Sequence, residues 1–150
     1  MKSVLRLSLF ACVFALVLPF AGAADLEPDT DGPWINVDVY DLVDYGDATF
    51  LEYLGRGYVA MLDAVKSEGL ILDYGVMMKT TGNTNDGDVV VWWSVNSLAD
   101  YEKAGLRMGE LASEIHTSGE WQEIWSNLQK VRTIKSSNLY RAVLWNKPKN

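Results

Sequence analysis

The stretch that most constrains the fold runs from Asp88 to Tyr101, where an expected strand passes directly into an expected helix. Val89–Val95 (VVVWWSV) is β-branched and aromatic, with apolar residues at both odd and even positions. A strand with one exposed face would alternate, so this pattern indicates a strand that is covered on both faces. Ser97 and Asp100 then form a Ser-x-x-Asp pattern typical of a helix N-terminus. The chain is therefore expected to build a sheet with helices on one face and a second apolar layer on the other.

Residues 1–23 have the three parts of a cleaved secretory signal. Lys2 and Arg6 form a short basic start, Leu7–Phe20 is an almost unbroken apolar run, and Ala21–Ala23 resembles an A-x-A cleavage site. The run is too short, and too soon followed by small and acidic residues, for a stable membrane span. The sequence therefore predicts a periplasmic or secreted protein, with no stable membrane insertion after the signal is cleaved.

The chain left by cleavage after Ala23 has 127 of the 150 residues, enough for one domain with its own core. Cys12, the single cysteine, lies inside the signal, where we interpret it as inert rather than as a lipid-attachment site. The mature chain can then form neither a disulfide nor a cysteine-ligated metal site, so its stability must come from packing or oligomerisation. Removal of Lys2 and Arg6 takes the net charge from −7 to −9, which makes nucleic acid and anionic membranes poor partners.

The remaining chain is interpreted as a single domain over residues 33–146, after a flexible lead-in at 24–32 and before a tail at 147–150. Turn-forming residues at 81–87 indicate a hairpin loop. Apolar periodicity predicts, in order, a strand at Trp34–Leu42, a helix at Ala48–Ser67, strands at Leu70–Thr80 and Asp88–Val95, a helix at Ser97–Ile115, a short helix from Ser118, and a final strand at Asn138–Trp145.

The ends and the middle of the first predicted helix carry their own signals. Asp47 is placed to cap its N-terminus and Gly69 to end it. Gly55 and Gly57 lie inside the helix, where each glycine costs about 1 kcal/mol relative to alanine. They either permit a close approach of the helix to the sheet or mark a kink.

This order of elements predicts an α+β fold of the ferredoxin-like β-α-β-β-α-β type, with a four-stranded antiparallel sheet, helices on one face and an extra short helix before the last strand. The strand with the Trp92–Trp93 pair, followed by SLADYEKA, resembles the dimeric α/β-barrel superfamily. That superfamily includes antibiotic-biosynthesis monooxygenases, stress-responsive barrel proteins and haem-degrading enzymes. The resemblance implies a homodimer in which the helix-free sheet faces of two copies enclose a barrel. Such a dimer would explain the two-sided strand and the absence of disulfides.

Alternation along the first strand assigns its residues to two faces under this resemblance. We expect Ile35, Val37 and Val39 to meet the helices. The other set should look into the barrel, together with one of the two adjacent tryptophans, and parity leaves open which one. The expected barrel-facing residues of the first strand are Trp34, Asn36, Asp38 and Tyr40.

A buried carboxylate needs a partner. Arg141 is the only cation in the first and last predicted strands, so an Asp38–Arg141 pair is expected. An aromatic pocket with a few polar groups would suit a small apolar or aromatic molecule. The candidate ligand-binding residues are Trp34, Asn36, Asp38, Tyr40, Trp92, Trp93 and Arg141.

His116, the only histidine, lies near the end of the second long helix. The resemblance to haem-degrading barrels implies that His116 is a haem ligand. Those enzymes also resemble this chain in having an Asn on the first strand, here Asn36, and a Trp on the third, here Trp92 or Trp93. However, His116 lies farther beyond the tryptophans than that family's pattern would place it. The alternative interpretation is a surface histidine that interacts with the helix C-terminus. No G-x-S-x-G motif accompanies it.

No metal site is expected, because the regularly spaced acids Asp38, Asp41, Asp44 and Asp47 cross a strand end and a turn and would not converge. The six tryptophans admit two interpretations: core and dimer interface, or a ligand cage. Trp121 and Trp125, one turn apart, are expected to anchor the short helix onto the domain.

Three functional hypotheses follow from these patterns. The first is an exported homodimer that binds a small molecule without a cofactor and without chemistry. The second is a cofactor-independent or haem-linked monooxygenase-like enzyme that uses the same pocket. The third is a structural dimer with a filled core.

Overall fold

The computed structural model describes residues 32–44, 46–82 and 86–143. The predicted signal at 1–23, Trp145 and the tail at 147–150 lie outside the described residues. The elements are, in order, β1 (Trp34–Leu42), α1 (Asp47–Leu54), η1 (Gly55–Val59, a π-helical turn), α2 (Ala60–Ser67), β2 (Asp73–Met78), β3 (Val89–Val95), α3 (Leu98–Ile115), α4 (Ser118–Val131) and β4 (Arg132–Arg141).

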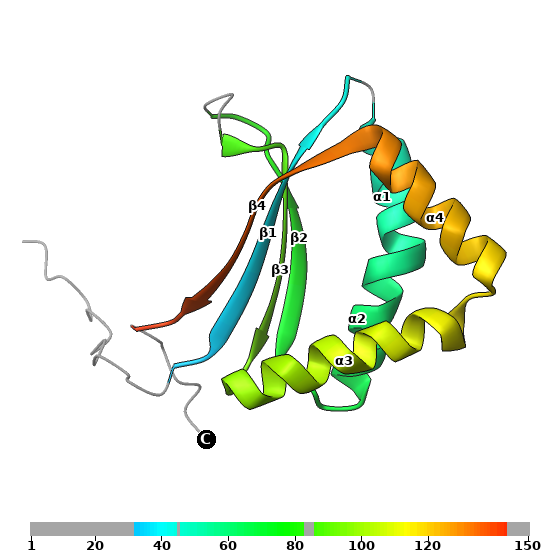
Figure 1. Cartoon of the computed structure of the whole chain (residues 1–150). Helices are drawn as coiled ribbons and strands as arrows, with labels where there is room; N and C mark the ends of the chain where they lie inside the picture. The colour runs from blue at the N-terminus through cyan, green and yellow to red at the C-terminus, as the bar shows by residue number, and fades with distance from the viewer. Residues whose placement is uncertain (1–31, 45, 83–85, 144–150) are drawn as a thin grey trace, which may run out of the picture.

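The four strands form one antiparallel sheet in the order β2-β3-β1-β4. β1 is central and pairs with β4 along its whole length and with β3 along Trp34–Tyr40. The helices lie on one side of this sheet, which Figure 1 shows nearly edge-on. The predicted α+β, ferredoxin-like architecture with helices on one face is therefore confirmed.

The main apolar core fills the space between the sheet and the helices. α1 and α2 contribute Phe50 and Leu62, and β3 contributes Val91; the exposed fraction of each of these three side chains is 0%. α4 adds Ile124 and Leu128, which are almost as deeply buried. Packing of this kind is what turns the amphipathic pattern of each helix into a fixed position over the sheet.

Two strands differ by more than one residue from their predicted bounds. β4 begins at Arg132, six residues before the predicted start at Asn138, and β2 is shorter than predicted at both ends. The residues at the start of β4 mix polar and apolar side chains, so their periodicity gives little strand signal. Hydrogen bonding to β1, whose Leu42 lies opposite Arg132, extends the strand through this segment.

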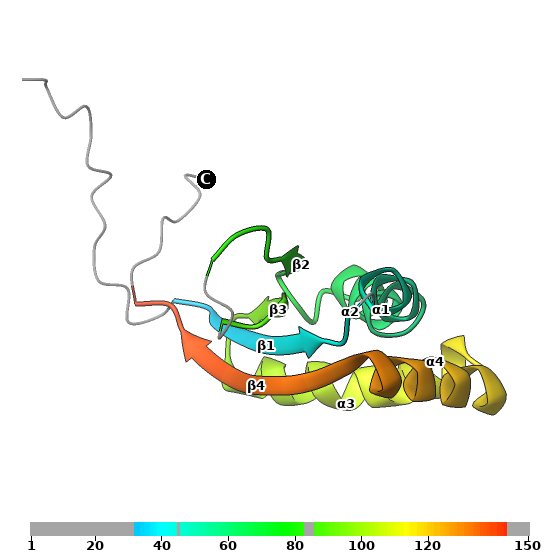
Figure 2. The same ribbon diagram turned by 90° about the horizontal axis from the view of Figure 1, so that it is seen from above.

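The segment predicted as a short helix is a 14-residue helix, α4. Thr117 and Glu120 form its capping box: Thr117 Oγ1 accepts from the Glu120 backbone N–H at 3.3 Å, and Glu120 Oε2 accepts from the Thr117 N–H at 2.9 Å. Figure 2 shows α4 running directly into β4 at the edge of the sheet. The predicted cap of α1 is wrong, because its N-cap is Gly46 and Asp47 makes no capping bond.

The first helical region is continuous from α1 through η1 to α2. Gly57 lies in η1, and a Cβ atom at this position would come within 2.8 Å of Ile124 Cγ2 in α4. Of the two predicted roles, close approach is therefore correct, but the neighbour is α4 and not the sheet. Gly69, with a φ of 74°, follows α2 and ends it as predicted.

The two faces of β1 are reversed relative to the prediction. Tyr40 packs on Phe50 of α1 with ring centroids 5.6 Å apart, and the Tyr101 hydroxyl of α3 donates to Asn36 Oδ1 at 3.3 Å. Parity could divide β1 into two sets, but only these tertiary partners decide which set meets the helices. The helix-facing residues are Trp34, Asn36, Asp38 and Tyr40, and the residues on the helix-free face are Ile35, Val37 and Val39.

The same alternation separates the two adjacent tryptophans of β3. Trp93 faces the helices, where its ring stacks on Tyr101 with centroids 4.9 Å apart and an interplanar angle of 4°. Trp92 faces the helix-free side and lies against Gly75 of β2, where a Cβ atom would come within 2.6 Å of the indole nitrogen. Of the pair, Trp92 is therefore the residue on the sheet face that was predicted to close the barrel.

Candidate functional site

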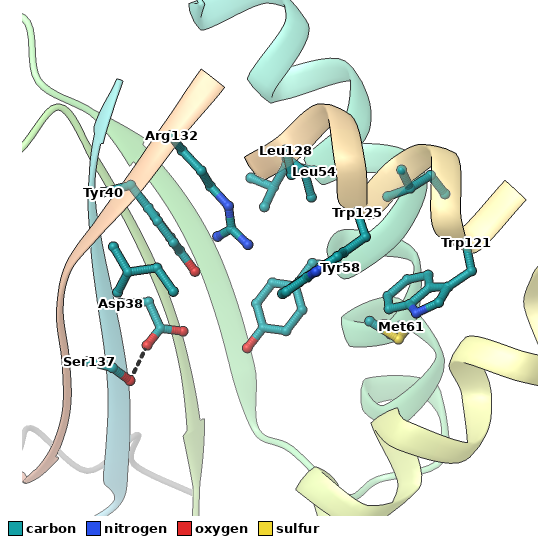
Figure 3. A pocket seen from close by; sticks show the side chains of 12 residues that line it. Asp38, Tyr40, Leu54, Tyr58, Met61, Trp121, Trp125, Leu128, Arg132 and Ser137 are labelled. Atoms are coloured by element: carbon teal, nitrogen blue, oxygen red, sulfur yellow. Dashed lines mark hydrogen bonds between the residues drawn. The ribbon is translucent and has the colours of Figure 1, made fainter. Parts of the chain in front are cut away.

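A cavity of about 370 Å³ opens between the sheet and the helices of the single chain. Figure 3 shows its strands on one side and its helices on the other. Asp38 and Tyr40 were expected on the opposite sheet face, inside a barrel, and this assignment of faces is corrected here. A pocket enclosed by two helix-free sheet faces stays a prediction. The cavity is lined by Asp38, Tyr40, Leu54, Tyr58, Met61, Trp121, Ile124, Trp125, Leu128, Arg132, Ile134 and Ser137.

The helical wall of the cavity is aromatic and apolar. Trp121 and Trp125 are one turn apart in α4, and their rings stack with centroids 6.5 Å apart. Trp125 keeps 45% of its surface exposed and Ile134 of β4 keeps 57%, so large apolar side chains line the cavity and also meet solvent. Gly57 allows α4 to lie close to η1, which brings this wall towards Tyr58.

The sheet wall carries a fixed carboxylate. Asp38 accepts a hydrogen bond from Asn36 Nδ2 at 3.1 Å and a short one from the Ser137 hydroxyl of β4. Asn36 in turn accepts from Tyr101 of α3, so the three side chains form a chain of hydrogen bonds from a helix to the cavity. Both carboxylate oxygens of Asp38 therefore have a donor within the protein, which fixes the orientation of this acid.

Two tyrosines that line the cavity, Tyr40 of β1 and Tyr58 of η1, lie near enough to Asp38 for its charge to act on their hydroxyls. Burial is the main cause that raises the pKa of Tyr58, and the neighbouring Asp38 charge acts in the same direction. The pKa of Tyr40 is also raised, first by burial and then by Asp38, while the Arg132 charge opposes the rise. Both hydroxyls stay protonated near neutral pH and can donate a hydrogen bond to a ligand.

Arg132, the first residue of β4, is the only cation among the described residues that line this cavity. Its guanidinium carbon lies 4.5 Å from the ring centroid of Tyr40 and 5.5 Å from that of Trp125. Such contacts over ring faces are cation–π interactions. Within residues 32–44, 46–82 and 86–143, no carboxylate lies within 4.0 Å of this guanidinium, which distinguishes Arg132 from the paired Arg56 and Arg107.

The structure brings together only part of the predicted site. Asp38 and Tyr40 line the cavity, and Asn36 lies behind Asp38 as its hydrogen-bond donor. Trp93 is in the core between β3 and α3, and Trp92 is on the other face of the sheet. These two tryptophans therefore do not line the cavity.

The predicted Asp38–Arg141 pair is also absent. The β1–β4 register places Arg141 opposite Trp34, and its guanidinium lies 5.6 Å from a Trp34 ring centroid. Asp38 lies opposite Ser137, four residues away along β4, and that hydroxyl takes the place of the expected cation. The register of β4 on β1 decides whether Arg141 or Ser137 lies beside Asp38, and the sequence does not give that register.

Ten of the twelve lining residues were not among the predicted site residues, and five of the ten show why. Trp121 and Trp125 were recognised as one face of a helix but were assigned only an anchoring role. Tyr58 belonged to a helical apolar stripe, and Arg132 and Ser137 lay before the predicted start of the last strand. A correct start for β4 would have placed both Arg132 and Ser137 beside β1.

His116 does not line the cavity between the sheet and the helices. It forms the C-cap of α3, stacks on Trp121 with centroids 5.8 Å apart, and borders a separate hollow of about 540 Å³. Its Nε2 atom is buried and has no hydrogen-bond partner among the described residues. The residues present therefore do not fit a haem that is bound in the cavity between sheet and helices through His116. Within the described part of the chain, no three His, Cys, Asp or Glu side chains are grouped to hold a metal ion.

Comparisons with known proteins agree on the fold. No protein-family model matches this sequence, and no curated protein matches it. A solved structure of a NIPSNAP family protein of unknown function from Agrobacterium tumefaciens has a TM-score of 0.56 at 11% identity, over 80% of this chain and 96% of that one. This likeness shows a shared ferredoxin-like fold.

Two further solved structures are similar to this chain at lower scores. One is a dimeric protein of unknown function with a ferredoxin-like fold from Bacteroides fragilis, with a TM-score of 0.47 and 10% identity over 74% of this chain and 97% of that one. The other is SnoaB, a cofactor-independent oxygenase from Streptomyces nogalater, also with a TM-score of 0.47 and 10% identity, over 79% of this chain and 99% of that one.

Fold and site together define the class of molecule: an α+β, ferredoxin-like protein with an aromatic cavity inside each chain, between sheet and helices. Among the described residues, no helix has the length and apolar character required to cross a membrane.

Proposed function

We propose that this protein is an exported homodimer that binds a small, largely apolar molecule in the cavity between its sheet and its helices. The observation that carries this proposal is the composition of the cavity walls. Two stacked tryptophans and several aliphatic side chains face a small polar group made by Asp38, Tyr40 and Ser137. Binding sites for small organic molecules typically combine an apolar lining with a few fixed polar groups in this way.

A neutral aromatic probe, 2-naphthalenemethanol, tests the pocket by isothermal titration calorimetry. Ser137→Tyr would fill the cavity from the exposed edge strand and remove the hydrogen bond from Ser137 to Asp38, and we expect it to weaken binding at least about tenfold, or about 1.4 kcal/mol. Thr133→Tyr is the matched control, because Thr133 is also exposed on β4 but does not line the cavity. Undetectable binding by the wild type, or equal binding by the Ser137→Tyr variant, would contradict the proposal.

The proposed dimer rests on the helix-free face of the sheet. Val37 and Trp92 lie opposite each other there, and Met77 of β2 and Tyr140 of β4 are 54% and 53% exposed. No helix in the described part of the chain covers this face. A second copy of the same face would bury it, as the resemblance to dimeric barrels implies.

The proposal of export rests on the signal-like residues 1–23.

A monooxygenase-like activity in the same pocket stays a prediction. Oxygen uptake in the presence of a bound aromatic substrate is the assay that tests it, and Asp38→Asn would remove the only carboxylate that lines the cavity.

A further inference from the structure

The two charged side chains that line the cavity, Asp38 and Arg132, differ in their partners. Both oxygens of Asp38 accept hydrogen bonds from protein donors, Asn36 and Ser137. Arg132 touches the ring faces of Tyr40 and Trp125, and no described carboxylate lies within 4.0 Å of it. The carboxylate is therefore satisfied by the protein, whereas the guanidinium has no anion of its own.

This arrangement is notable in an acidic protein. The chain has 20 acidic residues against 13 lysines and arginines, so carboxylates were abundant candidates to pair with Arg132. Arg107 shows the usual outcome, since it contacts Glu68, Glu110 and Glu114. Arg132 is instead held between two aromatic rings at the edge of an apolar cavity. The guanidinium also has a hydrogen bond with the Tyr40 side chain, but this bond and the ring contacts leave most of its five N–H donors available.

We propose that the natural ligand is an aromatic or similarly apolar carboxylic acid, whose carboxylate pairs with Arg132 while its apolar body lies against Trp125 and Tyr58. This inference rests on the proposed function, because it assigns the chemical class of the molecule bound in the same cavity. A guanidinium matches a carboxylate in shape and can donate two parallel hydrogen bonds to it. The neighbouring Tyr40 hydroxyl, which stays protonated, can donate to the same anion.

The test compares two probes that share one ring system and differ in charge, 2-naphthoate and 2-naphthalenemethanol, by isothermal titration calorimetry near neutral pH. We expect the wild type to bind the acid about tenfold or more tightly than the alcohol, because charge-assisted hydrogen bonds are stronger than neutral ones. The preference should shrink when the salt concentration is raised from about 0.02 M to about 0.5 M, because Arg132 is partly exposed to solvent and salt screens exposed pairs.

Variants assign the preference to one residue. Arg132→Gln should lower the affinity for 2-naphthoate to about that for 2-naphthalenemethanol, and it should change the affinity for the alcohol much less. Arg132→Lys keeps the charge and should retain part of the preference. Arg56→Gln is the matched control, since it removes the same charge from an exposed arginine that does not line the cavity. It should leave the preference intact.

The outcomes separate the two proposals. Equal affinity of the wild type for both probes would overturn the assignment of an acid and leave the pocket standing. Retention of the full preference for the acid by Arg132→Gln would overturn that assignment as well. Failure of the wild type to bind either probe would overturn both the pocket and the acid. The wild-type comparison needs no variant, so poor folding of Arg132→Gln cannot leave the inference undecided.

Discussion

At the scale of single residues, the cavity depends on polar side chains that are fixed by hydrogen bonds from their own strand and from neighbouring elements. Asp38 is oriented by Asn36 from the same strand and by Ser137 from the next. Asn36, only 5% exposed, is a buried amide that would be costly without the Tyr101 hydroxyl of α3. These polar groups stabilise the fold only as a network, because each one provides the hydrogen-bond partner that the next one needs.

Tyr58 gives a prediction on pH. The ordinary tyrosine pKa of 10.0 applies to the unfolded chain, while burial raises the pKa of Tyr58 in the folded protein. Above about pH 10 the unfolded state loses this proton and the folded state keeps it, so the free energy of unfolding falls by up to about 1.4 kcal/mol per pH unit. The stabilisation lost on the alkaline side is fully present below that pH.

Urea unfolding of the wild type and of Tyr58→Phe checks this sign. At about pH 8 both proteins carry an uncharged ring at this position, and the difference between them there sets the reference. Between about pH 10 and pH 11 we expect the wild type to lose about 1 kcal/mol more than the variant. Parallel alkaline losses in the two proteins would show that Tyr58 titrates normally in the fold.

At the scale of elements, the helical wall depends on how closely α4 approaches the first helical region. η1 is a π turn within an otherwise α-helical segment, and it carries both Gly57 and Tyr58. π turns inside α-helices often occur at functional sites. Here the turn places Gly57 against Ile124 of α4 and contributes Tyr58 to the lining of the cavity.

The two glycines of η1 should respond in opposite ways to alanine. A Cβ atom at Gly57 would come within 2.8 Å of the fully buried Ile124, so Gly57→Ala should lower the free energy of unfolding by about 1–3 kcal/mol. Nothing lies within 4 Å of a Cβ atom at Gly55, so Gly55→Ala should stabilise by about 0.5–1 kcal/mol. Denaturant unfolding measures both, and a stabilised Gly57→Ala variant would disprove the close contact.

At the scale of the whole molecule, the sheet has one face covered by helices and one face without them. The uncovered face includes valines and a tryptophan from the two central strands, β1 and β3, which is unusual for a face left in water. The chain has no cysteine after position 12, so no disulfide can compensate for a modest core. Burial between two subunits would supply the missing contribution.

A lysine in the centre of this face tests the proposed dimer. Val37→Lys should shift the protein from dimer to monomer in size-exclusion chromatography with light scattering, because the charge would be buried between subunits without a partner. Leu106→Lys is the control, since Leu106 is 73% exposed on α3, away from the sheet face. A monomeric wild type, or a dimer that survives Val37→Lys, would rule out this interface.

The exported form has a defined mass under our interpretation of residues 1–23. Intact-mass spectrometry of the protein recovered from the periplasm or the medium should give a chain that begins at Ala24. Recovery of the full 150-residue chain from the cytoplasm alone would contradict export. This measurement is independent of the pocket and of the dimer.

Much of the fold was predictable because it depends on local signals. The β-branched run of β3, the alternation of β1, and the Ser97 cap of α3 each depend on a few neighbouring residues. Residues of the right types for the site were also found, as Asp38 and Tyr40 show. These two residues were nevertheless assigned to the wrong face of the sheet.

The sequence alone determined the type and order of the strands and helices, because periodicity and capping are properties of short segments. Tertiary structure decided which face of β1 meets the helices, that β4 begins at Arg132, and that Ser137 rather than Arg141 lies beside Asp38. A strand divides its side chains equally between two faces, and shifting the register by one residue exchanges them. Only the packing of helices and the pairing of strands far apart in the sequence could make that choice.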